Sequence, residues 1–171
     1  MPPPLRKGVL AAHLTFSVGW LGAVVAYLVF DVTVATSNDA TAVRAAWIAM
    51  GQLTSVVLVP LAGASLASGV VMSVGTKWGL FRHWWVLISL LLTLFAVLIL
   101  LSEAGLIQSV AAMATDPRTS DASLLALPST LPHSIGGLVV LLLIEFLNVY
   151  KPQGLTPYGW RKQQEQRLQQ S

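Results

Sequence analysis

Residues 87–101 read LISLLLTLFAVLILL, a run that contains two hydroxyl groups and no charged side chain. Polar and apolar residues do not alternate in it, which excludes the pattern of a membrane β-barrel strand. Together with the aromatic residues that precede it, the run extends over residues 84–101. A helix of about 20 apolar residues crosses the roughly 30 Å hydrocarbon core of a bilayer. The stretch therefore predicts a transmembrane helix.

The rest of the chain has the same character. Its 171 residues are 55% hydrophobic and 10% charged, with a mean hydropathy of +0.72, whereas soluble domains carry about 25% charged residues. Three further apolar stretches cover residues 9–30, 47–74 and 131–150. We predict an all-α polytopic membrane protein: an antiparallel four-transmembrane-helix bundle formed by residues 1–150 as a single domain, and a cytoplasmic basic tail of residues 151–171.

The composition also excludes several classes of protein. So few basic residues cannot form an extensive nucleic-acid-binding face, and the lack of cysteine excludes disulfides and thiolate metal sites. Walker, dinucleotide-binding, HExxH and nucleophile-elbow motifs do not occur. The first apolar stretch exceeds the roughly 7–15 residues of a signal-peptide core, so we interpret it as an uncleaved first helix.

The distribution of charge predicts the orientation. Four spans place both termini on one side of the membrane, together with the connection between the second and third spans. That side carries eight of the ten basic residues: Arg6, Lys7, Lys77, Arg82, Lys151, Arg161, Lys162 and Arg167. The opposite side carries five of the seven acids: Asp31, Asp39, Glu103, Asp116 and Asp121. The positive-inside rule therefore predicts that both termini are cytoplasmic.

The second span and the second outer connection carry local signals. A helix capped near Asp39 can continue to Gly75, with a kink at Pro60, which lacks a backbone donor. In the outer connection, residues 103–114 extend the third span, residues 116–121 break it, and residues 123–127 form a short helix. Trp47, Trp78, Trp84 and Trp85 lie near span ends, where tryptophan favours the headgroup region, whereas Trp20 lies near the middle of a span and is expected to pack against other helices.

One face of the first span carries most of its polar and aromatic groups. His13, Ser17, Trp20, Val24, Tyr27 and Asp31 follow at intervals of four and three, which places them in one line along a helix. This face either packs against neighbouring helices or lines a ligand site. In the second span, Gln52 is a further polar residue that we expect to line the bundle.

Three residues are predicted at similar depth in the cytoplasmic half of the bundle. His13 and Glu145 each lie six residues from a basic residue at the cytoplasmic boundary, and Met72 lies five residues from one. Glu145 is expected to be the only acid in the hydrocarbon, so it needs a partner. His13 and Glu145 could form a hydrogen bond, a proton relay or a metal site. His13 could also bind haem b, with His83 or Met72 as the second axial ligand. His133 lies near the outer end of the fourth span, too far away to share this site.

Three stretches carry a resemblance to a known family: HLTFSVGWLG (residues 13–22), GTKWGLFRHWWV (residues 75–86) and YKPQGLTPYGWRKQ (residues 150–163). They resemble a family of small four-helix bacterial membrane proteins that is known as a domain of unknown function. The resemblance implies a multi-pass protein of the bacterial inner membrane. His13 and the Trp20–Gly22 element are also distantly similar to copper-resistance D-type proteins and to haem-containing protoporphyrinogen-oxidising membrane proteins, which implies a metal or haem ligand at His13.

These patterns leave three functions open. The first is binding of haem b or a transition metal ion at His13, with electron transfer or metal handling as the role. The second is a non-enzymatic scaffold or partner subunit, as a homodimer or beside another membrane subunit. The third is a small proton-coupled transporter that uses Glu145. The sequence does not decide whether the protein is an enzyme.

Overall fold

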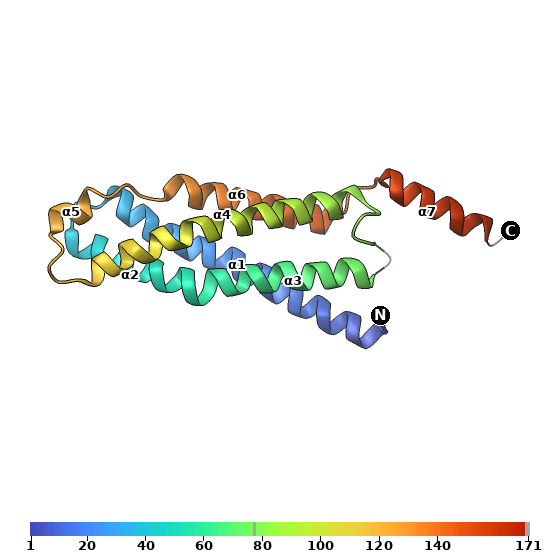
Figure 1. Cartoon of the computed structure of the whole chain (residues 1–171), viewed down its shortest axis with the longest axis horizontal. Helices are drawn as coiled ribbons and strands as arrows, with labels where there is room; N and C mark the ends of the chain where they lie inside the picture. The colour runs from blue at the N-terminus through green and yellow to red at the C-terminus, as the bar shows by residue number, and fades with distance from the viewer. Residues whose placement is uncertain (77, 170–171) are drawn as a thin grey trace.

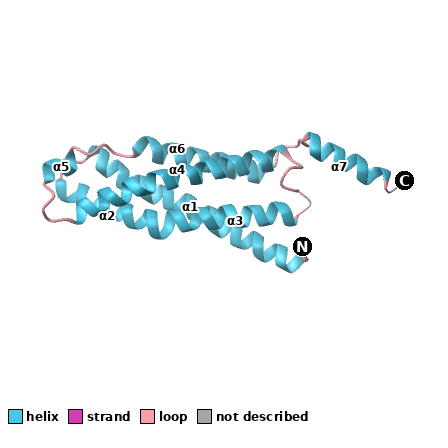
Figure 2. Cartoon of the chain, in the orientation of Figure 1, coloured by secondary structure: helices cyan, strands magenta, loops and turns pink. Residues whose placement is uncertain are grey.

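The computed structural model describes residues 1–76 and 78–169 and is built from long helices. Within these residues, four helices are long and apolar enough to cross a membrane: Pro3–Thr36, Ala40–Gly75, Trp84–Thr115 and Leu131–Tyr150. They lie side by side in an elongated bundle, and the N- and C-termini are at the same end (Figure 1). Short connections at alternate ends make consecutive helices antiparallel, and helix dominates the chain (Figure 2). The all-helical prediction is confirmed, and Lys77, used above for the orientation, lies outside the described residues.

The bundle has a definite order of neighbours. Helix α1 (Pro3–Thr36) packs against α2 (Ala40–Leu53), α3 (Val59–Gly75) and α6 (Leu131–Tyr150). Helix α4 (Trp84–Thr115) packs against the same three helices from the other side. The buried core includes Trp20, Trp47 and Met50. Trp20 packs in the core as expected. Trp47 is also in the core, and Trp85 is buried with its ring against Trp78.

The helix from Ala40 to Gly75 is interrupted by one wide turn. Residues Thr54–Leu58 form a π-helical turn, η1, in which the Val59 N–H donates to the Thr54 carbonyl. This turn ends two residues before Pro60, the position of the predicted kink. The wider turn reduces the steric clash between the proline ring and the backbone of the preceding turn. Just before η1, Gly51 lets α4 approach closely, because a Cβ there would overlap Ala111. The Gln108 amide of α4 donates to the Gly51 carbonyl at 2.6 Å.

An arginine holds the end of the bundle that is opposite to the termini. The Arg44 guanidinium of α2 donates to the carbonyls of Ala114 at 2.8 Å and Thr119 at 2.8 Å. It also contacts the Asp121 carboxylate at 3.2 Å. The connection after α4 is thereby fixed, and a short helix, α5 (Asp121–Leu125), follows it. The third span extends and breaks as the sequence predicted, and the short helix begins two residues earlier than predicted.

The C-terminal segment has more structure than its polar composition indicates. Helix α6 ends at Tyr150, where Lys151 adopts a left-handed conformation with φ 46°. A further helix, α7 (Pro157–Leu168), then projects beyond the bundle (Figure 1). Its start is capped by the Thr156 hydroxyl, which accepts from the Gly159 N–H at 3.1 Å.

Candidate functional site

A fully buried carboxylate lies at the junction of α1 and α6. Asp31 has no exposed surface and accepts three hydrogen bonds from the start of α6. The Thr130 N–H donates at 3.0 Å, the Thr130 hydroxyl at 3.0 Å and the Ser134 hydroxyl at 2.7 Å. Because buried polar groups are costly without partners, three donors on one carboxylate define a specific contact.

The sequence explains why these groups meet. Tyr27 and Asp31 are four residues apart on α1, and Thr130 and Ser134 are four residues apart at the start of α6, so each pair lies on one helix face. Thr130 is the N-cap residue of α6, but its side chain makes no capping bond within its own helix. The Asp31 carboxylate of α1 instead accepts from the Thr130 N–H and so caps α6 from the neighbouring helix. A negative charge is favourable there because the N-terminus of a helix carries partial positive charge. The Tyr27 hydroxyl extends the network to the Thr130 hydroxyl at 2.9 Å.

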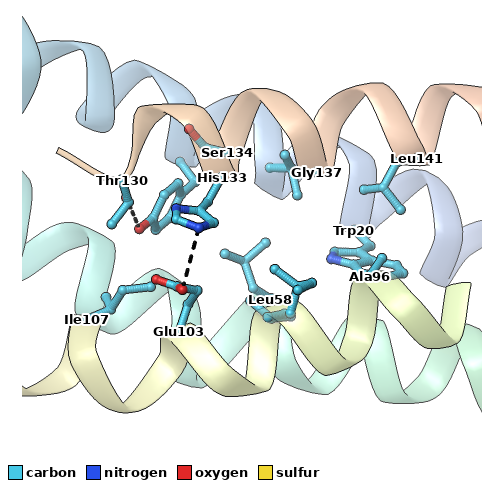
Figure 3. A pocket seen from close by; sticks show the side chains of 14 residues that line it. Trp20, Leu58, Ala96, Glu103, Ile107, Thr130, His133, Ser134, Gly137 and Leu141 are labelled. Carbon is cyan, nitrogen blue, oxygen red and sulfur yellow. Dashed lines mark hydrogen bonds and ion pairs between the residues drawn. The ribbon is translucent and has the colours of Figure 1, made fainter. Parts of the chain in front are cut away.

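A pocket lies beside this network, between α1, η1, α4 and α6. It has a volume of about 90 Å³ and is a cleft rather than a closed cavity. Figure 3 shows its two ends: Thr130, Ser134, His133 and Glu103 gather at one, while Trp20, Ala96 and Leu141 lie at the other. The lining residues are Trp20, Val24, Tyr27, Leu58, Ala96, Ile99, Leu100, Glu103, Ile107, Thr130, His133, Ser134, Gly137 and Leu141. The pocket is therefore polar at one end and apolar along the rest.

An acid and a histidine face each other at the polar end. His133 Nε2 lies 3.7 Å from Glu103 Oε1, with side-chain exposures of 56% and 24% respectively. Ile99 on α4 and His133 on α6 are the two exposed lining residues. The opening of the pocket therefore lies between α4 and α6, on a face that the other described helices do not cover.

The face of α1 predicted from the sequence divides between two partners. Trp20, Tyr27 and Asp31 are buried, and Trp20 and Tyr27 line the pocket. His13 and Ser17 instead face α3. His13 Nδ1 lies 3.0 Å from the Ser68 hydroxyl, and the Ser17 and Ser65 hydroxyls are 2.9 Å apart. The imidazole of His13 rests on Gly69, whose missing side chain leaves room for it.

The structure separates two of the four side chains predicted to form a haem or metal site from the other two. Met72 follows Ser68 by four residues, so it shares the face of α3 that His13 contacts. Glu145 is on α6, which diverges from the N-terminal part of α1 (Figure 1). The Nδ1 atom of His83 bonds to the Trp78 carbonyl at 2.6 Å, where the chain enters α4. Within residues 1–76 and 78–169, no group of three or more His, Cys, Asp or Glu side chains is placed to hold a metal ion.

Gln52 is exposed rather than lining the bundle, because Gly51 and Thr54 occupy the buried face of the helix at that level. Two acids besides Glu145 lie among the packed helices, since Asp31 is buried and Glu103 lines the pocket. The sequence places Glu103 in the outer connection because it follows the apolar run. It does not predict the pairing of Thr130 and Ser134 with Asp31, although their spacing of four residues is visible.

No family model, curated protein or solved structure matches this chain. The resemblance to a four-helix bacterial membrane family therefore stays a prediction.

The Asp31 contact predicts a specific loss of stability. In Asp31→Asn, the charge is lost and one acceptor oxygen becomes an NH₂ group, so the Thr130 and Ser134 hydroxyls lose the oxygen to which they donate, and we expect the free energy of unfolding to fall by about 1–3 kcal/mol. Asp39→Asn is the matched control, because Asp39 is an exposed N-cap residue and asparagine caps a helix equally well. The measurement is denaturant unfolding of both variants in detergent, followed by circular dichroism. Equal stability of the two variants would contradict the role given to Asp31.

Proposed function

We propose that this chain is an integral membrane protein whose four long helices cross a bacterial inner membrane, with both termini cytoplasmic. Two observations support the proposal. Both termini lie at the same end of the bundle (Figure 1), and most of the basic residues belong to the termini and to the connection between the second and third spans. In this orientation the Asp31 network and the pocket lie toward the outer surface. The Arg44 contacts lie beyond them.

We further propose that the pocket binds a small amphipathic molecule that enters from the lipid. The observation that carries this proposal is the polarity of the pocket: hydrogen-bonding side chains lie at one end and apolar side chains along the rest. Ligand sites typically combine an apolar lining with a few placed polar groups. An opening between two membrane-spanning helices gives access from the lipid rather than from water.

The dimensions and chemistry narrow the class of ligand. A volume of about 90 Å³ accommodates a ring or a short headgroup, and the open side leaves space for an alkyl tail in the bilayer. His133 supplies a donor and Glu103 an acceptor, and the Tyr27 hydroxyl, whose proton goes to Thr130, offers its oxygen as a further acceptor. A ring with carbonyl or hydroxyl substituents, such as a quinone or an alkylphenol, matches this set of groups.

Two neighbouring glycines allow a direct test of binding. A Cβ added at Gly137 or at Gly136 meets no atom within 4 Å, so a side chain can start at either position without displacing a neighbour, but only Gly137 lines the pocket. We expect Gly137→Leu to weaken binding of an alkyl-benzoquinone probe by about tenfold or more and Gly136→Leu to leave it unchanged. Quenching of tryptophan fluorescence in nanodiscs measures the binding, since Trp20 lines the pocket.

The two variants distinguish binding of the probe in the pocket from its partitioning into the lipid bilayer. Equal quenching of both variants and the native protein would show that the probe only dissolves in the bilayer, which would refute the proposed site. Thermal unfolding of each variant confirms that the bundle is intact.

A second candidate function is binding of haem b or a metal ion at His13, and one observation favours it. The Ser68 hydroxyl donates to the Ala64 carbonyl at 2.6 Å, so His13 Nδ1–H is the donor in the contact with Ser68. The Nε2 atom then carries the lone pair, and a histidine oriented by its other nitrogen is typical of metal ligands. Met72 on the same face of α3 is the available second donor.

This candidate makes a spectroscopic prediction. Protein purified from cells supplied with haem and trace metals is expected to show a Soret band or a stoichiometric metal, which His13→Ala removes and Thr15→Ala retains. Thr15 is exposed and bonds only within its own helix. The absence of both signals from the native protein, or their persistence in His13→Ala, would exclude a site at His13.

A further inference from the structure

The C-terminal segment docks onto the connection that leads into α4. The Thr156 N–H donates to the Arg82 carbonyl at 3.0 Å, and the Trp84 N–H donates to the Gly154 carbonyl at 3.3 Å. His83 and Leu155 form an isolated antiparallel bridge. Gly159 packs directly on the Arg82 backbone, where any side chain would overlap it. Two segments that are distant in sequence are thus held together at the end of the bundle near the termini.

Their junction borders a second, open pocket of about 490 Å³. It is lined by Trp78, Arg82, His83, Leu155, Gln163 and Gln166. The lining contains two side chains that can carry positive charge and two amides, and none of these six residues is acidic. A pocket with this lining favours an anion.

The guanidinium of Arg82 is only partly used by the protein. One terminal nitrogen donates to the Gln166 side chain at 3.3 Å, while the Nε atom is buried and has no hydrogen-bond partner. A buried donor without a partner is uncommon in folded proteins and indicates a missing partner. The fixed fork of a guanidinium matches the oxygens of a phosphate group.

A neighbouring cation supports an anion at the same place. The Nδ1–H of His83 donates to the Trp78 carbonyl, which holds the His83 ring and Trp78 together at the edge of the pocket. The Lys151 ammonium lies 5.9 Å from the centre of the Trp78 ring and adds positive charge beside the pocket.

The pocket lies where the membrane-spanning helices end. It is next to the start of α4, and the exposed aromatic side chains Phe81, Trp84, Tyr150 and Trp160 surround this end of the bundle. Exposed aromatic residues at the ends of spans mark the headgroup level of a bilayer. An anion reaching this pocket can therefore come from the lipid as well as from the cytoplasm.

We propose that the pocket between residues 78–83 and 155–166 binds a phosphate group, carried either by an anionic lipid headgroup or by a soluble phosphate compound. Arg82 is the principal ligand, and Gln163 and Gln166 position the oxygens. This site is separate from the pocket beside Asp31 and does not depend on the function proposed for it.

The test introduces a negative charge without altering the size of the side chain. Gln163→Glu places a carboxylate in the lining, where it competes for Arg82, whereas Gln164→Glu adds the same charge to an exposed neighbour on α7. The full chain is reconstituted in phosphatidylcholine nanodiscs with or without phosphatidic acid, and retained lipid is measured by native mass spectrometry. In the second arm, inorganic phosphate is titrated into protein in pure phosphatidylcholine by calorimetry.

We expect the native chain to bind in at least one arm, Gln163→Glu to bind about tenfold more weakly in that arm, and Gln164→Glu to stay within about twofold of native. Retention of phosphatidic acid without calorimetric binding identifies a lipid headgroup, and binding of inorganic phosphate identifies a soluble ligand. Binding in neither arm, or equal losses in the two variants, would overturn the proposal. Circular dichroism confirms that α7 remains helical in both variants.

Discussion

The contact between Asp31 and the start of α6 joins the first and last of the long helices, and the arrangement of the half of the bundle opposite to the termini depends on it. The carboxylate is fully buried and takes three hydrogen bonds from Thr130 and Ser134. In a low-dielectric interior such bonds are strong, and their loss leaves donors unpaired. The contact fixes the position of α6 along α1 and places His133 and Gly137 on the same face of the pocket.

The two ends of the bundle are held by different means. Opposite to the termini, Arg44 binds backbone carbonyls of the connection after α4, so this end is fixed by one cation and several acceptors. At the end with the termini, backbone bonds join residues 82–84 to residues 154–156. Each fixed end adjoins a pocket: an apolar one with a polar end beside Asp31 and a cationic one beside Arg82. In the proposed orientation, these pockets face opposite sides of the membrane.

The sequence predicts the helices well because their signals are local. Hydropathy, the cap at Asp39 and the break after Thr115 each act within a few residues, and the structure agrees with these three signals. At Pro60 the structure shows a π-helical turn that ends two residues before the proline. The site was harder to predict because it depends on which helices are neighbours. The spacing shows that His13 and Asp31 lie on one face of the first helix. It does not show that His13 contacts α3 while Asp31 contacts α6, because spacing identifies a helix face but not the helix that packs against it. Glu145 is conspicuous in the sequence because it lies within an apolar stretch. Asp31 and Glu103 each follow an apolar stretch, so the sequence assigns them to connections.

The central claim is that Asp31 and the first turn of α6 act as one unit, and a double-mutant cycle tests it most directly. The free energy of unfolding is measured for Asp31→Asn, Ser134→Ala and the double variant. If the two side chains interact as described, the double variant loses less stability than the sum of the single variants, by about 1 kcal/mol or more. Effects that add to within about 0.5 kcal/mol would mean that the residues act independently, and this would contradict the account of how α1 and α6 are joined.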